Sequence, residues 1–158
     1  MAFELQSVLT PTSIGRIDHF LDDLNGADQN RALQYNLEIL DQFGDVMKVR
    51  SGNEVPYLTA AQITQLKAFM TARRAVLPND LGFAAGHQVG RCTWRFRDGD
   101  VSGASRSLHA RVIELDAQGH FIQRHQFNDH PNLTSQMISG ALAFMDAQRV
   151  KAIAEILG

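Results

Sequence analysis

The sequence predicts an α+β fold, in which N-terminal helices and a long C-terminal helix pack on one face of a small antiparallel β-meander. Three observations lead to this class. Apolar residues recur at helical spacing early in the chain, alternate with polar residues between positions 89 and 127, and return to helical spacing at the end. The length of 158 residues suits one globular domain over 1–158.

Two helices are predicted before position 44. The first has an apolar stripe and a stop at Gly26, and its stripe is Ile14, Ile17, Leu21 and Leu24. The second follows Asp28 and ends at Gly44, with a stripe of Leu33, Leu37, Leu40 and Phe43. Segments 46–50 and 55–58 then have extended character, and the turn residues between them predict a small β-hairpin.

The third predicted helix begins at a capping box formed by Thr59 and Gln62 and ends before Pro78. Alternating residues then predict strands over 89–97, 108–115 and 120–127, with a glycine- and serine-containing loop over 98–107. A closing helix of about six turns starts near Asn132 or Thr134. No internal repeat is evident in the sequence.

Composition excludes several classes of protein. Hydrophobic residues make up 44% and charged residues 20%, which argues against disorder. No apolar run is long enough to span a membrane, and residues 1–15 lack the features of a secretory signal, so we expect a cytoplasmic protein, with signal-less export left open. The net charge of −2 disfavours a general nucleic-acid coat.

Arginines gather on the predicted sheet. In the strand over 89–97, Cys92, Trp94 and Phe96 point to one side and the arginines to the other, because strand side chains alternate. With the neighbouring strands, the second side forms a candidate binding face for anionic groups: Arg91, Arg95, Arg97, His109, Arg111 and Arg124. The simpler interpretation is an ordinary solvated sheet face whose arginines pair with nearby acids.

Histidines cluster in the same part of the chain and raise the hypothesis of a metal-dependent hydrolase. The candidate ligands are His125, Asp129 and His130, which could converge if the chain turns back at Asn128. Neither the H-E-x-x-H ligand pair nor a glycine-rich phosphate motif is present, so the sequence predicts no cofactor.

Cys92 is the single thiol and offers a second chemical hypothesis. A cysteine-dependent hydrolase or deamidase would use Cys92 as the nucleophile and His109 or His125 as its base. The mid-strand position of Cys92, in line with Trp94 and Phe96, also suits a small buried core residue.

Together these features favour a non-enzymatic interaction protein. We expect the arginine and histidine face, with the 98–107 loop, to bind an acidic protein partner or a small anion. Nucleic acid is disfavoured because the face lacks aromatic side chains on which bases stack. Two copies could also pair through uncovered edge strands, although arginine-rich edges oppose this.

Overall fold

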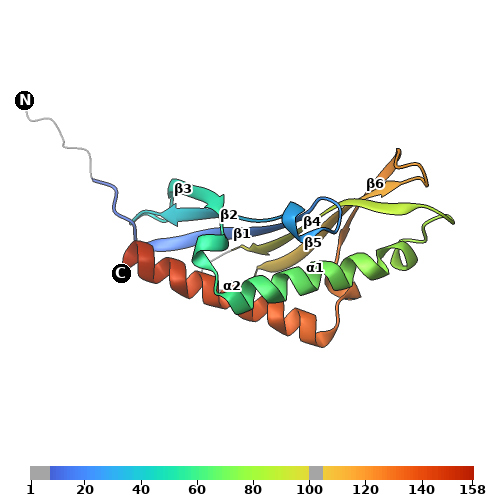
Figure 1. Cartoon of the computed structure of the whole chain (residues 1–158). Coiled ribbons are helices and arrows are strands. Elements are labelled where there is room, and N and C mark those ends of the chain that lie inside the picture. Colours follow the sequence, from blue (N-terminus) through green and yellow to red (C-terminus); the bar gives the residue numbers. More distant parts are fainter. Residues whose placement is uncertain (1–7, 100–104) are drawn as a thin grey trace, which may run out of the picture.

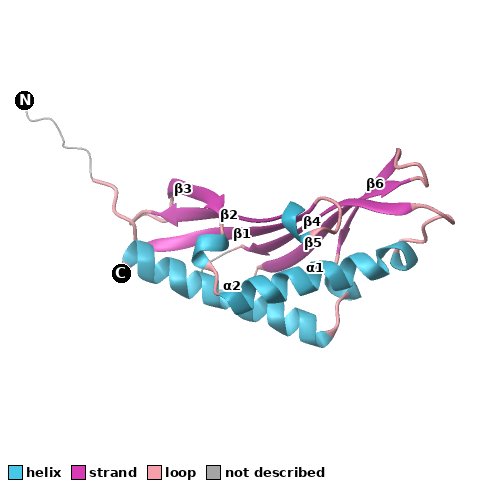
Figure 2. Ribbon diagram, in the orientation of Figure 1, coloured by secondary structure: helices cyan, strands magenta, loops and turns pink. Residues whose placement is uncertain are grey.

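The computed structural model describes residues 8–99 and 105–158. Its eight main elements form one six-stranded antiparallel sheet, in the order β3-β2-β1-β4-β5-β6, and two long helices against it (Figures 1 and 2). Their bounds are β1 Ser13–Asp23, β2 Arg31–Leu40, β3 Val46–Asn53, α1 Ala60–Asp80, β4 Gln88–Asp98, β5 Arg106–Leu115, β6 Phe121–Asn128 and α2 Ser135–Leu157. The predicted α+β class is therefore confirmed.

The prediction of two helices before position 44 is wrong, because both segments form strands. Leu33 and Leu37 are spaced four residues apart, which satisfies a helical stripe and one face of a strand equally well. In the structure Tyr35 and Ile39 are buried beside them, so the true period of β2 is two. Residues 46–53 likewise form one continuous strand, and 55–57 form a 3₁₀ turn instead of a second strand.

The remaining elements follow the sequence closely. Thr59 and Gln62 form the predicted capping box at the start of α1, although that helix continues through Pro78 to Asp80. The three predicted strands correspond to β4, β5 and β6, and Thr134 caps α2. Of the predicted 98–107 loop, residues 100–104 lie outside the described part of the chain.

The chain contains an internal repeat that the sequence analysis missed. Ser13–Asp23 and Gln88–Asp98 begin 75 positions apart, and the same offset relates β2 to β5, β3 to β6 and the start of α1 to that of α2. Each half is thus a β-β-β-α unit. Both helices are preceded by the pattern Asn-Glu/Asp-x-Pro-x-Leu-Thr, at 53–59 and 128–134. Between 13–83 and 88–158 only 18 of 71 positions are identical, so the repeat is inconspicuous by eye.

The two halves meet along the central strands β1 and β4. Phe20 on β1 lies directly opposite Arg95 on β4, and the two residues also occupy equivalent positions in the repeat. A pseudo-twofold axis therefore passes between Phe20 and Arg95. This axis places Arg95 at the centre of the sheet.

A buried ion cluster occurs at equivalent places in both halves. Asp98 is fully buried, accepts a hydrogen bond from Arg149 at 2.8 Å and pairs with Arg106 at 3.3 Å. In the first half Asp23 holds Arg31 at 3.4 Å and Arg74 at 3.6 Å. Each pair of arginines joins a strand and a helix to one carboxylate, which fixes the helices on the sheet.

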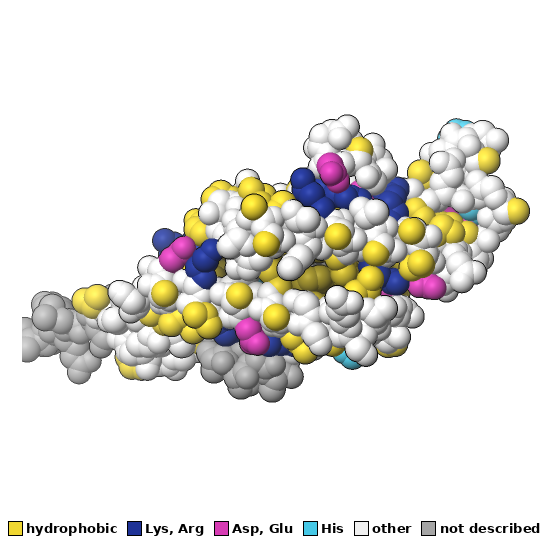
Figure 3. Space-filling view, turned by 60° about the horizontal axis from the view of Figure 1, so that its bottom comes forward, with side chains coloured by type: hydrophobic (Ala, Val, Ile, Leu, Met, Phe, Trp, Pro, Cys, Tyr) yellow, Lys and Arg dark blue, Asp and Glu magenta, His cyan; other side chains and the backbone are white. Residues whose placement is uncertain are grey.

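Both helices cover the same face of the sheet and leave the opposite face uncovered (Figure 2). The larger apolar core lies under them and includes Leu21, Met70, Trp94, Phe96 and Met145. Seen from the helix side, an apolar hollow separates α1 from α2 (Figure 3). Within residues 8–99 and 105–158, no helix is both long and apolar enough to cross a membrane.

Candidate functional site: the uncovered face of the sheet

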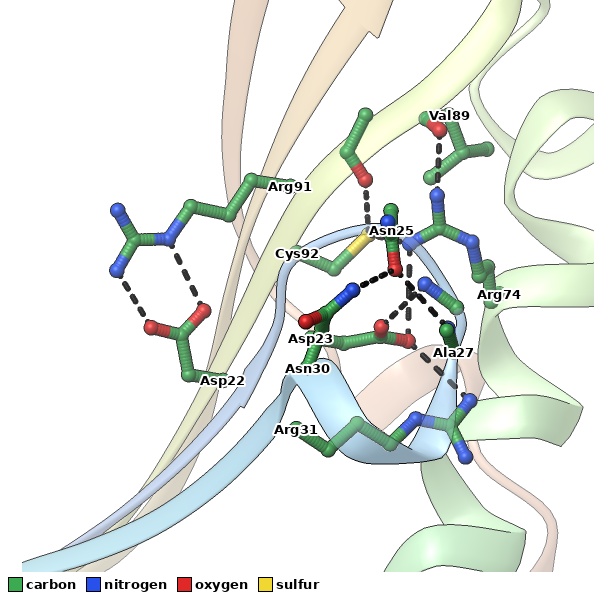
Figure 4. Close-up of polar contacts among 12 residues, drawn as sticks. Asp22, Asp23, Asn25, Ala27, Asn30, Arg31, Arg74, Val89, Arg91 and Cys92 are labelled. Carbon is green, nitrogen blue, oxygen red and sulfur yellow. Dashed lines mark hydrogen bonds and ion pairs between the residues drawn. The ribbon is translucent and has the colours of Figure 1, made fainter.

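Strand β4 has the two-sided character that the sequence predicts. Cys92, Trp94 and Phe96 are at most 2% exposed beneath the helices. Figure 4 shows Cys92 on one side of the strand with Asp23 and Arg74, while Arg91 and Asp22 lie on the other. Arg95 and Arg97 share the side of Arg91, because successive even and odd positions alternate between faces.

Neighbouring strands add the other predicted binding residues to this face. Arg95 lies opposite His109 on β5, and Thr93 lies opposite Arg111. On β6, Arg124 faces Ile113, which is two residues from Arg111 on the same side of β5. The six residues proposed from the sequence are therefore on one face. We call the set Arg95, His109, Arg111 and Arg124 the cationic row.

The other arginines of the face are already paired with acids. Arg91 donates two hydrogen bonds to the carboxylate of Asp22, at 3.0 and 2.5 Å. Arg97 donates to the buried Asp18 at 3.2 Å, and Arg16 approaches the second oxygen of Asp18 at 3.2 Å. Each of these carboxylates neutralises charge locally, so the three arginines are less available to a ligand than the row beside them.

The arginines of the cationic row have no acidic partner among the described residues. The Nε atom of Arg95 is buried and forms no hydrogen bond within the described part of the chain. Burial lowers the pKa of the Arg95 guanidinium, and the nearby charge of Arg97 adds to this effect. Such a desolvated donor without an acceptor is costly, and a bound carboxylate or phosphate would relieve the cost.

His109 contributes a neutral group to the row at pH 7. Burial is the largest cause that lowers the pKa of His109, and the charges of Arg95 and Arg97 lower it further. The imidazole is therefore uncharged at neutral pH, and its N–H can donate a hydrogen bond without adding a cation. The positive charge of the row at pH 7 comes from the arginines.

The structure does not assemble the proposed cysteine site. Cys92 is fully buried, and burial raises the pKa of its thiol to about 12. His109 lies on the opposite face of the sheet, and His125 is separated from Cys92 by the intervening Val112. A thiolate is thus disfavoured at Cys92, and neither histidine contacts its sulfur.

The proposed metal ligands are also held apart. Asp129 is fully buried and accepts hydrogen bonds from Arg73 at 2.8 and 3.0 Å and from Trp94 at 3.2 Å. His125 instead bonds to Glu114 at 2.9 Å, while His130 is exposed. No group of three or more potential ligands converges among the described residues.

A histidine and carboxylate cluster that the sequence did not reveal lies near the outer strands. Glu114 accepts hydrogen bonds from His87 at 2.5 Å and from His125 at 2.9 Å. These bonds lower the pKa of Glu114 to about 2. The ring of Phe83 stacks on His125 with centroids 5.6 Å apart. Both imidazoles are committed to the carboxylate, so the cluster stabilises the strand arrangement.

Sequence reasoning missed the residues that the first half contributes to the uncovered face. Phe20 lies beside Arg95, and Asp18 and Asp22 pair with the arginines of β4. The missed signal was the alternation of Ile17, His19 and Leu21 with Asp18, Phe20 and Asp22 along one strand.

Comparison of the chain with protein-family models, with curated proteins and with solved structures found no match.

Proposed function

We propose that this protein is a non-enzymatic binding protein that holds an acidic protein segment on the cationic row. One observation carries the proposal: three arginines that have no acidic partner within residues 8–99 and 105–158, from three adjacent strands, share the face that the helices leave uncovered. Opposite charges favour encounter with a carboxylate-rich chain, and arginine binds carboxylates with two parallel hydrogen bonds.

The internal repeat supports this hypothesis over an ordinary solvated sheet face. The positions equivalent to Arg95, Arg111 and Arg124 hold Phe20, Asn36 and Val49 in the first half. Both halves form the same strands and pairings. The fold therefore does not require arginine at these positions, which supports a role in recognition.

The spacing of the row favours an extended ligand over a single small ion. Neighbouring strands are about 4.8 Å apart, so a row across β4, β5 and β6 extends about 10 Å between its outer backbones. Arg111 and Arg124 are exposed to solvent on the uncovered face of the sheet. A series of carboxylates can contact several of these arginines at once, whereas one phosphate would contact part of the row.

The test measures binding of a fluorescein-labelled peptide of twelve glutamates to the purified chain. The variant Arg95→Gln with Arg111→Gln removes two charges while retaining polar side chains of moderate length. We expect the double variant to bind the peptide at least about tenfold more weakly, which corresponds to about 1.4 kcal/mol. Wild-type binding should weaken as salt rises, since exposed charges are screened.

A matched variant, Lys48→Gln with Lys67→Gln, removes the same charge away from the uncovered face. It should bind the peptide within about twofold of wild type. Equal weakening by both double variants would show attraction by net charge alone and overturn the proposal. Wild-type protein that binds inorganic phosphate but not the peptide would overturn it in favour of a small-anion site.

A further inference from the structure

The hollow between α1 and α2 lies on the helix side of the sheet, away from the cationic row. Its volume is about 550 Å³, within the range of about 300–1,000 Å³ that is typical of small-molecule sites. Phe96 forms its floor, and Phe69 and Phe144 stand on its two walls. In Figure 3 the apolar side chains of the floor are visible between the two helices.

The described residues that line the hollow are all uncharged. Among the described residues, no charged side chain lines it, and its polar groups are amides and a hydroxyl from Gln62, Gln65, Gln136 and Thr134. Phe96 meets Phe69 edge to face with centroids 5.4 Å apart and Phe144 at 6.4 Å. A charged ligand would lose its hydration here without gaining a counterion, so the lining is complementary to an uncharged molecule.

The repeat shows how the hollow arises. Gln65 and Leu66 of α1 are equivalent to Gly140 and Ala141 of α2, so the second half has much smaller side chains at these positions. A Cβ atom added to Gly140 would meet no atom within 4 Å. Glycine within a helix also lowers helix stability relative to alanine. The small residues keep the hollow open on the α2 side.

One end of the hollow is bridged, which argues for a compact occupant. Gln62 on α1 donates a hydrogen bond to Gln148 on α2 at 3.4 Å, and this contact joins the helices across the hollow. An extended peptide could not pass between the helices at that end. We infer that the hollow is a binding site for an uncharged, mainly apolar small molecule with an aromatic ring.

The experiment uses the uncharged fluorophore N-phenyl-1-naphthylamine as the probe with the full chain. We expect saturable, one-to-one binding with increased probe fluorescence. Quenching of Trp94 emission should accompany it, because the Trp94 ring lies 5.9 Å from that of Phe69 in the wall. The variant Gly140→Gln, which copies Gln65, should weaken probe binding at least about tenfold by placing a side chain in the hollow.

The control is Gly140→Ala, which improves helix propensity but adds a single methyl group, and it should retain binding within about threefold. Ala141→Leu, which copies Leu66, is a second filling variant with the same expected loss. If neither filling variant weakens binding, or if wild type takes up the probe without saturation or without quenching Trp94, the inference is wrong. Loss of a wild-type dimer on probe addition would assign the hollow to a second copy and overturn it as well.

Discussion

The two halves differ in how they hold one buried acid. In the second half, Asp129 accepts two hydrogen bonds from Arg73 and one from the Trp94 indole. Arg73 belongs to α1, so this contact links the helix of one half to the turn of the other. A fully buried carboxylate is stable there because a guanidinium balances its charge.

The equivalent acid of the first half has weaker partners. Glu54 bonds to His19 at 2.7 Å and accepts a hydrogen bond from Gln148 at 3.2 Å. His19 and Gln148 occupy the positions of Trp94 and Arg73 in the repeat. The comparison shows that the fold requires a hydrogen-bonded acid before each helix, contacted by the opposite helix, while the donors differ.

A second contrast separates the residues that both halves share from those that one half has alone. The clusters around Asp23 and Asp98 use arginines at equivalent positions, so the fold determines them. The cationic row occurs in the second half alone, and Gly140 and Ala141 of the hollow replace the larger Gln65 and Leu66 of the first half. At these positions the first half forms the same strands and helix with different side chains.

The largest expected effect concerns the two buried acids. Asp129→Asn should destabilise the protein by about 3–5 kcal/mol, because Arg73 loses its buried counterion. Glu54→Gln should cost about 1–3 kcal/mol, since the lost partners are an imidazole and an amide. Urea unfolding followed by Trp94 fluorescence measures both values. Equal losses would show that the two halves hold their acids with the same strength.

The next prediction concerns Cys92, whose equivalent position in the first half is the buried Ile17. With its pKa raised to about 12 from an ordinary value near 9, the thiolate population below pH 9 falls about 1,000-fold. Iodoacetamide should therefore label native Cys92 at least that much more slowly than the urea-unfolded chain. Rapid labelling of the folded protein would contradict core burial and revive the cysteine hydrolase hypothesis.

A smaller loss of stability is expected in acid, and it should arise from a residue of the second half, Glu114. The pKa of Glu114 is lowered to about 2 by hydrogen bonds from His87 and His125, and the equivalent residue is the uncharged Ile39. A carboxylate with a depressed folded-state pKa stabilises the protein above its unfolded pKa, near 4.5, and this contribution disappears as pH falls toward 2. Glu114→Gln should flatten unfolding free energy against pH in this window; an unchanged slope would refute the assignment.

The sequence was most informative where one pattern has one structural meaning. The capping box of α1, the alternation in β4 and the apolar stripe of α2 are local signals, and each predicted its element correctly. Residues 33–40 failed because leucines four apart fit both a helix and a strand. The strand wins because β1 and β3 supply hydrogen bonds on both of its sides, and these partners are distant in sequence or separated by a turn.

The same division applies to the candidate site. Alternation alone places Arg91, Arg95 and Arg97 on the side opposite Trp94, because the geometry of an extended chain requires it. Only the tertiary structure decided which of these arginines are neutralised, since Asp22 precedes Arg91 by 69 residues and Asp18 precedes Arg97 by 79. It also excluded a meeting of Cys92 with His109, because sheet pairing sets them on opposite faces. Local chemistry thus followed from the sequence, whereas partnership between distant groups depended on how the two halves pair.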